Sequence, residues 1–376
     1  MNVDDDLLIC EEVKKSVKTW STKTKKEEIE STFTDYKKFI LRKWIFMAVC
    51  VVIMIFVAGT AITIGNFSIG ILESYEVIWN HITGNIIDEQ LDFIVIDLRL
   101  PRIVTGIVAG AGLAVAGVAM QSILKNPLAD PYTTGVSSGA GFGATLAITL
   151  GVSFSTGQYA IVINAFLFAL VPAFVIMSVA KMKNASPTVM IMAGVAIMYI
   201  FNAMTTVLKL WAKPDDLAGV YKWQVGTLAS TSWSDIALIA VVVIIGIIAI
   251  QYLSRKLNVL ATGDENAKAL GINVDNLRII CMLLVACVSA TVVSFTGLIG
   301  FVGLVAPHVV RLFIGADNRY LVPASCLFGA ALMISADLIG RTILAPTVLQ
   351  VGVITSFLGG PLFLWLIIRR KEDIWG

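Results

Sequence analysis

The 376 residues are 57% apolar and only 14% charged, with a mean hydropathy of +0.85. Soluble domains carry about 25% charged residues, so this composition excludes an ordinary soluble protein and predicts a chain that crosses a membrane many times. The net charge of +2 does not indicate nucleic-acid binding, because the charges are confined to a tail and short loops. The five cysteines show no metal-binding or CxxC spacing, so they predict neither redox nor metal chemistry.

Residues 1–43 are dense in both signs of charge and are expected to form a cytoplasmic N-terminal tail. Apolar residues recur in this tail every three to four positions, which permits an amphipathic helix on the membrane surface; a solvated tail is the alternative that we favour. The first apolar run begins only near Trp44. That is too late for a cleavable signal peptide, so the run is predicted to be retained as a membrane span.

A helix needs about 20 consecutive apolar residues to cross a bilayer. Stretches of this kind, the third and eighth of them short, are predicted at 44–64, 102–124, 135–151, 159–180, 188–210, 235–253, 277–296, 301–314, 321–340 and 349–368. We therefore expect an all-α polytopic membrane protein of about ten transmembrane helices. Its transmembrane domain would cover 44–370, and 371–376 would be a cytoplasmic C-terminus. No GxxxxGK[ST] sequence occurs, so no P-loop is predicted in this chain.

Lysine and arginine in the loops predict the orientation, because they concentrate on the cytoplasmic side. With the N-terminus in the cytoplasm, most of the 28 basic residues fall inside. The residues left outside are Arg99, Arg102, Lys209, Lys213, Lys222 and Arg341. Both termini are therefore expected on the cytoplasmic side. The chain itself is expected in the plasma membrane or inner membrane of the cell.

Two predicted spans carry small residues at every fourth position. They are Gly106, Gly110 and Ala114 on the second span, and Gly135, Gly139, Gly143 and Ala147 on the third. Small residues let helices approach closely in lipid, where apolar burial cannot drive association. These faces are expected to be helix contacts, although glycine is also generally frequent in membrane helices.

A polar island at 254–278 separates two long apolar runs and is predicted to be cytoplasmic. Thr262 stands three residues before Glu265, the spacing of a capping box at a helix start. Asp264 and Glu265 would oppose the positive end of the helix dipole, and Gly271 offers a permissive stop about two turns later. A helix this short is unstable alone in water, so another surface must hold it.

The apolar side chains available for that contact are Ala267, Leu270 and Ile272. One interpretation is a docking helix through which a partner acts on the neighbouring spans. An ordinary connecting loop is equally compatible with the local sequence.

Five stretches then carry a resemblance to a known family. They are Leu98–Arg102 (LRLPR), Lys125–Ala140, Leu260–Gly271, Gly300–Arg311 and Leu358–Leu366. In this order they closely resemble the FecCD family, the permease subunits of binding-protein-dependent ABC importers for iron–siderophore complexes, haem and cobalamin. The similarity runs from about Trp44 to Arg370. The chain departs from the family at Thr347–Gln350, where Glu-Leu-Pro is commoner, and its N-terminal tail is longer.

The resemblance implies a type II ABC importer permease fold with ten helices per chain. It also implies a homodimer, or a pair with a paralogue, around one central path. Partners would be two ATPase subunits that bind ATP and Mg, and an extracytoplasmic substrate-binding protein. The chain itself would be no enzyme and would bind no cofactor or metal.

The family's functional positions carry over to three sets of residues. The ATPase-coupling set is Thr262, Gly263, Asp264, Glu265, Ala267, Lys268, Leu270 and Gly271. The arginines that receive carboxylates of the binding protein match Arg99, Arg102 and Arg341. Spans five and ten line the path in relatives, and span five offers Met198, Asn202, Met204 and Thr205.

Two buried polar residues have competing interpretations. Asp337 is the carboxylate placed well inside a span, one turn before Arg341, so it is either a proton-coupling site or a structural ion pair; we favour the pair. Asp337 would then form an ion pair with Arg341, and Arg102 would only anchor a helix end. His308 is either a metal ligand or, as we favour, a hydrogen-bonded structural residue. His81 in the outer loop is expected to be exposed.

The sequence therefore predicts the permease of an ABC importer for a bulky metal chelate, with iron–siderophore as the first candidate and haem or a corrinoid as alternatives. A different class, the ion-coupled secondary transporter, needs an ionisable site near the midplane, for which Asp337 is the one candidate. An intramembrane hydrolase would need a nucleophile and a base together, and no such arrangement is evident.

Overall fold

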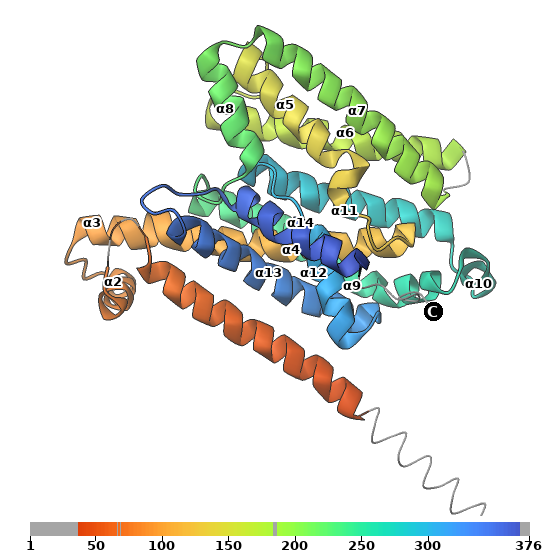
Figure 1. Cartoon of the computed structure of the whole chain (residues 1–376), viewed down its shortest axis with the longest axis horizontal. Helices are drawn as coiled ribbons and strands as arrows, with labels where there is room; N and C mark the ends of the chain where they lie inside the picture. The colour runs from red at the N-terminus through yellow and green to blue at the C-terminus, as the bar shows by residue number, and fades with distance from the viewer. Residues whose placement is uncertain (1–36, 66, 68, 183–185, 369–376) are drawn as a thin grey trace, which may run out of the picture. The chain divides into compact units, whose positions relative to one another are not determined.

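The computed structural model describes residues 37–65, 67, 69–182 and 186–368. These residues form helices and loops and contain no β-strand (Figure 1). The chain divides into two units, Met1–Phe46 and Met47–Gly376, and the candidate site lies in the second. The expectations for residues 1–36 and 371–376 lie outside the described residues. Residues 37–43 continue into the first span as helix, so this part of the predicted tail is not a solvated coil.

Seven of the described helices are long and apolar enough to cross a membrane, and further apolar helices are shorter. The long ones are Lys37–Thr63, Glu89–Leu124, Gly157–Met182, Pro187–Trp211 (α7), Trp233–Ala261 (α9), Val274–Thr296 (α11) and Asn318–Thr342 (α13). The shorter ones are Val136–Leu150 (α5), Val302–Ile314 (α12) and Val351–Ile368 (α14). Each matches a predicted span in chain order, and the all-α membrane fold is confirmed.

Several long helices have internal joints, and short helices connect them. Glu89–Leu124 consists of α3 (Glu89–Asp92), a π-helix η1 (Phe93–Arg99) and α4 (Leu100–Leu124). The 3-10 turn η3 (Gly157–Tyr159) leads into α6 (Ala160–Met182). The connecting elements are α2 (Ile71–Thr83), η2 (Pro131–Thr134), α8 (Pro214–Val225) and α10 (Asp264–Ala269). The sequence analysis did not predict α2 or α8.

The buried centre of the second unit is α4, which packs against α9, α11, α12 and α13. Gly110 of α4 lies against the backbone of Gly329 on α13, and Gly139 and Gly143 of α5 lie against the backbone of α6. The predicted small-residue faces are therefore helix contacts. Their absent side chains allow the close packing that stabilises helices in lipid.

Two predicted boundaries are wrong in a way that matters for the site. The second span begins at Glu89 rather than near 102, and α9 continues to Ala261 rather than ending near 253. The predicted coupling loop 254–278 is thus reduced to the residues between Ala261 and Val274. Figure 1 shows α10 at one end of the helices of the second unit and α2 and α3 at the opposite end.

Candidate functional site

The short helix α10 begins and ends near the predicted residues. It follows Gly263, whose φ of 123° suits glycine, and it stops before Gly271, whose φ of 80° is left-handed. The predicted capping box is wrong. The Thr262 hydroxyl donates to the Val259 carbonyl at 2.8 Å, back into α9, and the N-cap residue is Gly263, which has no side chain.

The three apolar residues expected to dock α10 have different environments, and Ile272 among them is half-buried. Ala267 is fully buried inside the chain and is not available to a partner, whereas Leu270 is 70% exposed. Glu265 and Lys268 are exposed beside it. Ala267 therefore holds α10 on its own chain, and Leu270 is the apolar side chain that α10 presents outward.

Asp264 ties α10 to two long helices through one carboxylate oxygen. Its Oδ1 accepts a hydrogen bond from Lys125 Nζ at 2.7 Å and from Arg278 Nη2 at 2.9 Å. The Arg278 side chain on α11 is only 1% exposed, and its Nε donates to the Ile123 carbonyl of α4 at 3.1 Å. Burial raises the pKa of Asp264, but the bonds from Lys125 and Arg278 outweigh it and hold the pKa below its usual value. We call Asp264, Lys125 and Arg278 the Asp264 clamp.

The last turn of α4 also bonds α12 and α13. Ser122 donates to Asn318 Oδ1 of α13 at 3.3 Å, and Gln121 donates to the Leu304 carbonyl of α12 at 3.3 Å. Arg311 of α12 donates back to Gln121 Oε1 at 3.0 Å. Hydrogen bonds from α10, α11, α12 and α13 thus converge where α4 ends. They hold these five helices together at this end of the bundle.

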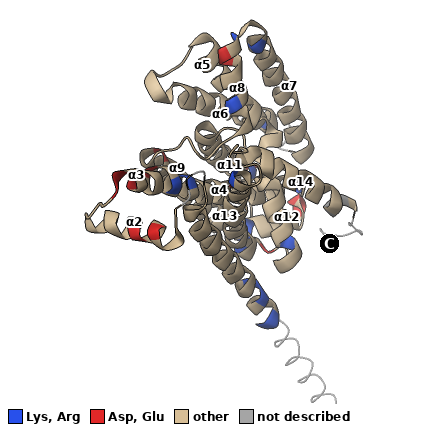
Figure 2. Ribbon diagram, turned by 60° about the vertical axis from the view of Figure 1, so that its left-hand side comes forward, with Lys and Arg blue, Asp and Glu red and all other residues tan. Residues whose placement is uncertain are grey.

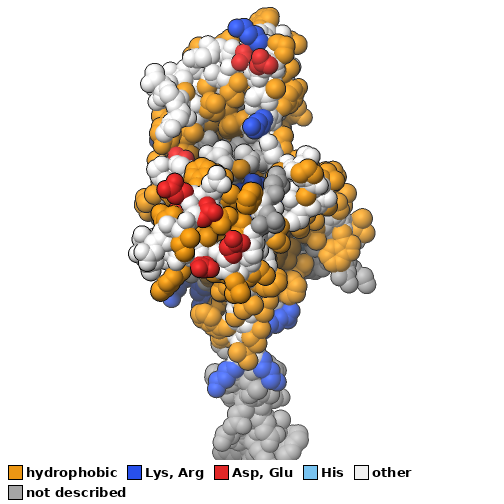
Figure 3. All heavy atoms as spheres, turned by 90° about the vertical axis from the view of Figure 1, so that its left-hand side faces the viewer, with side chains coloured by type: hydrophobic (Ala, Val, Ile, Leu, Met, Phe, Trp, Pro, Cys, Tyr) orange, Lys and Arg blue, Asp and Glu red, His pale blue; other side chains and the backbone are white. Residues whose placement is uncertain are grey.

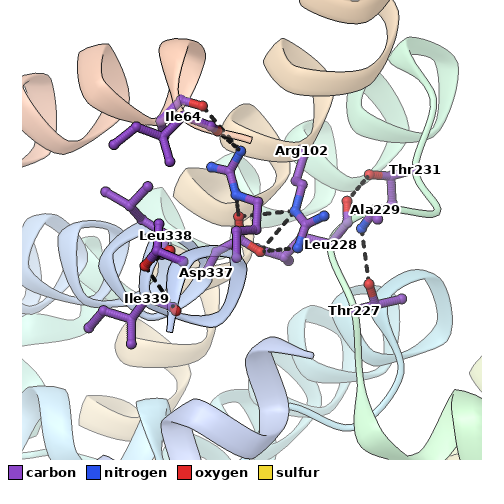
Figure 4. A network of polar contacts seen from close by, with 12 residues as sticks. Ile64, Arg102, Thr227, Leu228, Ala229, Thr231, Asp337, Leu338 and Ile339 are labelled. Carbon is purple, nitrogen blue, oxygen red and sulfur yellow. Dashed lines mark hydrogen bonds and ion pairs between the residues drawn. The ribbon is translucent and has the colours of Figure 1, made fainter. Parts of the chain in front are cut away.

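The predicted docking arginines gather at the other end of α4, where Arg99 and Arg102 lie near Arg341 of α13. Figure 4 shows Arg102 beside Asp337 of α13. Arg102 binds Asp337 through Nε and Nη2 at 2.7 to 3.0 Å, and Arg341 Nε lies 3.1 Å from Asp337 Oδ2. Arg99 donates to the carbonyls of Ile62 at 2.6 Å and of Thr63 at 2.9 Å. We call Arg99, Arg102, Arg341 and Asp337 the arginine cluster.

The three arginines expected to receive carboxylates of a binding protein already have partners inside the chain. Arg99 and Arg341 are each 6% exposed, and Arg102 is mostly covered. Asp337 pairs with Arg341 as favoured, but its stronger partner, Arg102, was not predicted. The arginine cluster holds three guanidinium groups and one carboxylate, so it keeps an excess of positive charge.

An open cavity of roughly 250 Å³ reaches the arginine cluster. It is lined by the three arginines together with Gly65, Phe67, Ile94, Leu98 and Val348. Arg341 Nη2 is buried and has no hydrogen-bond partner among the described residues. A carboxylate that reached Arg341 Nη2 would meet one charged donor, and charge-assisted hydrogen bonds are stronger than neutral ones.

The four predicted path residues do not share one face of α7. Thr205 is buried within the chain and its hydroxyl donates to the Phe201 carbonyl at 2.8 Å, so it does not face a path. Met198 is half-buried, and Asn202 is exposed. Met204 is exposed but lies roughly 200° around the helix from Asn202. Asn202 and Met198 remain as path candidates on one side.

Among the described residues, no group of three or more His, Cys, Asp and Glu side chains is arranged to hold a metal ion. His308 lies buried in α12. The alternatives stated for His308 are not separated by this geometry.

Asp130, in the turn between α4 and α5, gives a prediction about pH. Its carboxylate caps η2 by accepting from Tyr132 N at 3.2 Å, and burial raises its pKa to about 6 although that hydrogen bond lowers it in part. The folded pKa exceeds the unfolded value of about 3.9, so stability is greatest below pH 4 and declines as the pH rises through 6.

Asp130→Asn keeps the acceptor and removes the charge. At pH 8 it should be more stable than the wild type by up to about 3 kcal/mol, a gain that vanishes towards pH 4. Thermal unfolding of both proteins from pH 4 to 8 measures this. A gain of equal size at every pH would contradict the assignment.

Comparison with known proteins adds relatives to this geometry. The FecCD transport family matches residues 49–369. A protein of Methanocaldococcus jannaschii described as an ABC transporter permease is 40% identical over 90% of this chain and 98% of its own length. The hemin transport system permease protein HmuU of Yersinia pestis is 35% identical over 83% of this chain and 93% of its own.

A solved structure of a metal-chelate type ABC transporter in an inward-facing conformation is also similar. It aligns with a TM-score of 0.76 and 28% identity, over 86% of this chain and 99% of that one. Its helical arrangement is therefore shared across nearly the whole of the second unit.

Proposed function

Because the chain belongs to the FecCD transport family, we propose that it is the permease of an ABC importer that carries a bulky metal chelate into the cytoplasm. The observation that carries this proposal is the match over residues 49–369 together with the metal-chelate transporter structure. Iron–siderophore is the first candidate cargo. Haem is an alternative supported by the hemin permease relative, and a corrinoid is a further one from the family resemblance.

A separate ATPase subunit, which binds ATP and Mg, is proposed to dock on the exposed side of α10. Glu265, Lys268 and Leu270 form this surface, and the Asp264 clamp holds α10 to α4 and α11 behind it. Thr262, Gly263, Ala267 and Gly271 shape and seat the helix rather than touch the partner. A push on Leu270 would therefore reach the long helices directly.

The extracytoplasmic binding protein is proposed to dock at the arginine cluster. Support comes from the surplus of positive charge and from the Arg341 Nη2 donor without a partner among the described residues. With two permease copies there are two such cavities. A carboxylate on each lobe of the binding protein could then enter one of them. A second copy would cover the exposed side of α7 near Asn202 and enclose the path.

The ion-coupled carrier was the alternative from another class, and its one candidate site was Asp337. In the structure Arg102 and Arg341 both bind this carboxylate, which favours its role as a structural partner in the arginine cluster. Uptake of labelled iron–siderophore, haem and cobalamin into vesicles that hold the complete complex separates the cargoes. Uptake driven by an ion gradient without ATP would contradict the proposed class.

Leu270→Asp tests the coupling surface. Because Leu270 is mostly exposed, the variant should fold and insert normally, yet a charge in the packed contact costs several kcal/mol if it stays unpaired. The ATPase subunit should no longer copurify, and uptake should fall to background. Leu270→Met is the matched control and should retain both.

Copurification and uptake that survive Leu270→Asp would show that α10 is not the docking surface. Ala267→Asp is unsuitable for this test, since Ala267 is buried in the chain and a charge there would unfold its own surroundings.

A further inference from the structure

Helix α2 has three distinct faces, although it is only 13 residues long. It follows the helix that ends at Thr63 and precedes the one that begins at Glu89, both of which can cross a membrane. The Glu73 carboxylate accepts from the Gly70 backbone N–H at 3.0 Å where the helix begins. The C-cap Gly84 ends it with a left-handed φ of 75°.

One face fixes α2 to the rest of the second unit. Val77 and Ile78 pack against a buried cluster that includes Ala61 and Val95. His81 Nδ1 lies 2.9 Å from the Asp92 carboxylate of α3. The side chain is 42% exposed, as expected, and it is nevertheless paired. Helix α2 is therefore attached firmly and cannot turn to bury its other faces.

The second face is an apolar stripe that is largely exposed. Its members are Ile71, Leu72, Tyr75, Trp79 and Ile82. The Tyr75 hydroxyl lies against Gly59 of the neighbouring span, and the rest of its ring is half exposed. Trp79 is 67% exposed and Leu72 is 85% exposed. Side chains this large and apolar, gathered in one stripe, mark an interaction surface.

The third face is acidic. Glu73 and Glu76 lie on it, and with Asp88 and Asp92 they line a cavity of roughly 140 Å³ between α2 and α3. Figure 2 shows acidic positions along α2, and Figure 3 shows acidic side chains set among exposed apolar ones at this end of the chain. A helix that joins an apolar stripe to a charged stripe suits a boundary between lipid and water.

We infer that α2 lies in the plane of the membrane interface, with the stripe of Leu72, Tyr75, Trp79 and Ile82 embedded in lipid and the acidic face in water. The neighbouring span, which Tyr75 of the stripe contacts at Gly59, also exposes large apolar side chains, among them Val52 and Phe56. Tyrosine and tryptophan are enriched at the level of lipid headgroups.

The acidic face decides which lipid is needed. Interfacial helices commonly use lysine and arginine to bind anionic lipid, but α2 offers Glu73 and Glu76 instead. Insertion must then come from apolar burial, so zwitterionic phosphatidylcholine should suffice. The inference rests only on the chain spanning a membrane and is independent of the proposed transport.

The test uses the full chain in phosphatidylcholine vesicles, free of native cysteines, with one fluorophore on a single new cysteine. Ile82→Cys places the probe on the apolar stripe, and Glu76→Cys places the matched control on the acidic face. Nitroxide groups on the lipid acyl chains should remove most of the emission at position 82 and little at position 76. Iodide in the water should do the reverse.

Equal quenching by iodide at both positions would overturn the inference, because the stripe would then face water. Protection of position 82 from both quenchers would overturn it as well, because a second copy or another protein would then cover the stripe. A second measurement needs no cysteine. Brominated phosphatidylcholine should quench a smaller fraction of the tryptophan emission in Trp79→Phe than in the wild type. An unchanged fraction would contradict the lipid contact.

Discussion

Asp337→Asn should destabilise the protein by about 3–5 kcal/mol, the cost of removing one partner from a buried ion pair. Asp337 is 2% exposed and is the carboxylate to which both Arg102 and Arg341 bind. Without its charge, the two buried guanidinium groups of Arg102 and Arg341 lie close together with no negative charge between them. The midpoint of thermal unfolding in detergent and the yield of folded protein should both fall.

Asp97→Asn is the matched control, since Asp97 lies exposed on η1 close in sequence to Arg99. It should leave the unfolding midpoint unchanged. Adding Arg102→Gln to Asp337→Asn should restore part of the lost stability, because it removes one of the unpaired charges. If the double variant is no more stable than Asp337→Asn, the loss reflects packing at this position rather than charge.

Asp264→Asn should separate ATP hydrolysis from transport. The amide oxygen can still accept from Lys125 and Arg278, but the acceptor loses its charge and both ion pairs are lost. Hydrogen bonds to charged groups contribute about 1.5–3 kcal/mol, so weakening two of them should lower the population of the anchored position of α10 by about tenfold. Leu270 and the exposed surface of α10 remain, so the ATPase subunit should still bind. The amount transported per ATP hydrolysed should fall about tenfold or more.

Asp264 is about a third exposed, so water can partly replace its contacts and global stability should fall less than for Asp337→Asn. Asp275→Asn, in the first turn of α11, is the control and should behave as the wild type. An unchanged ratio of transport to hydrolysis in Asp264→Asn would mean that the clamp plays no part in coupling. Loss of ATPase binding would instead point to damage of the docking surface itself.

The spans could be predicted because each needs a long apolar run, a signal that is local and strong. The limits of α10 could be predicted as well, since Gly263 and Gly271 supply the unusual backbone angles at its ends. Helix α8 also had a readable signal, with Pro214 in its first turn and two aspartates following. It is simply too short and too polar to count as a span.

Contacts between residues that are far apart in the chain could not be predicted from the sequence. Arg278 falls on the same face of α11 as the buried Val274 and Leu277, which signals a buried charge in need of a partner. Nothing local identifies Asp264 as that partner. Charge bias predicts that Arg99 lies outside, but it does not identify its acceptors, which are the backbone carbonyls of Ile62 and Thr63 and cannot be recognised in a sequence.

The unbroken course of α4 has a mechanical consequence. Its 25 residues span about 37 Å and end in the arginine cluster on one side and in the Asp264 clamp on the other. A rod pinned at both tips cannot tilt at one tip alone. If the two partners dock at these ends as proposed and α4 tilts during the cycle, the two binding events are thermodynamically linked. The factor by which ATPase docking changes affinity for the binding protein must then equal the factor in the other direction. The π-helix η1, directly before α4, is then the natural pivot, because its wider turns interrupt the regular hydrogen bonding between α3 and the rod.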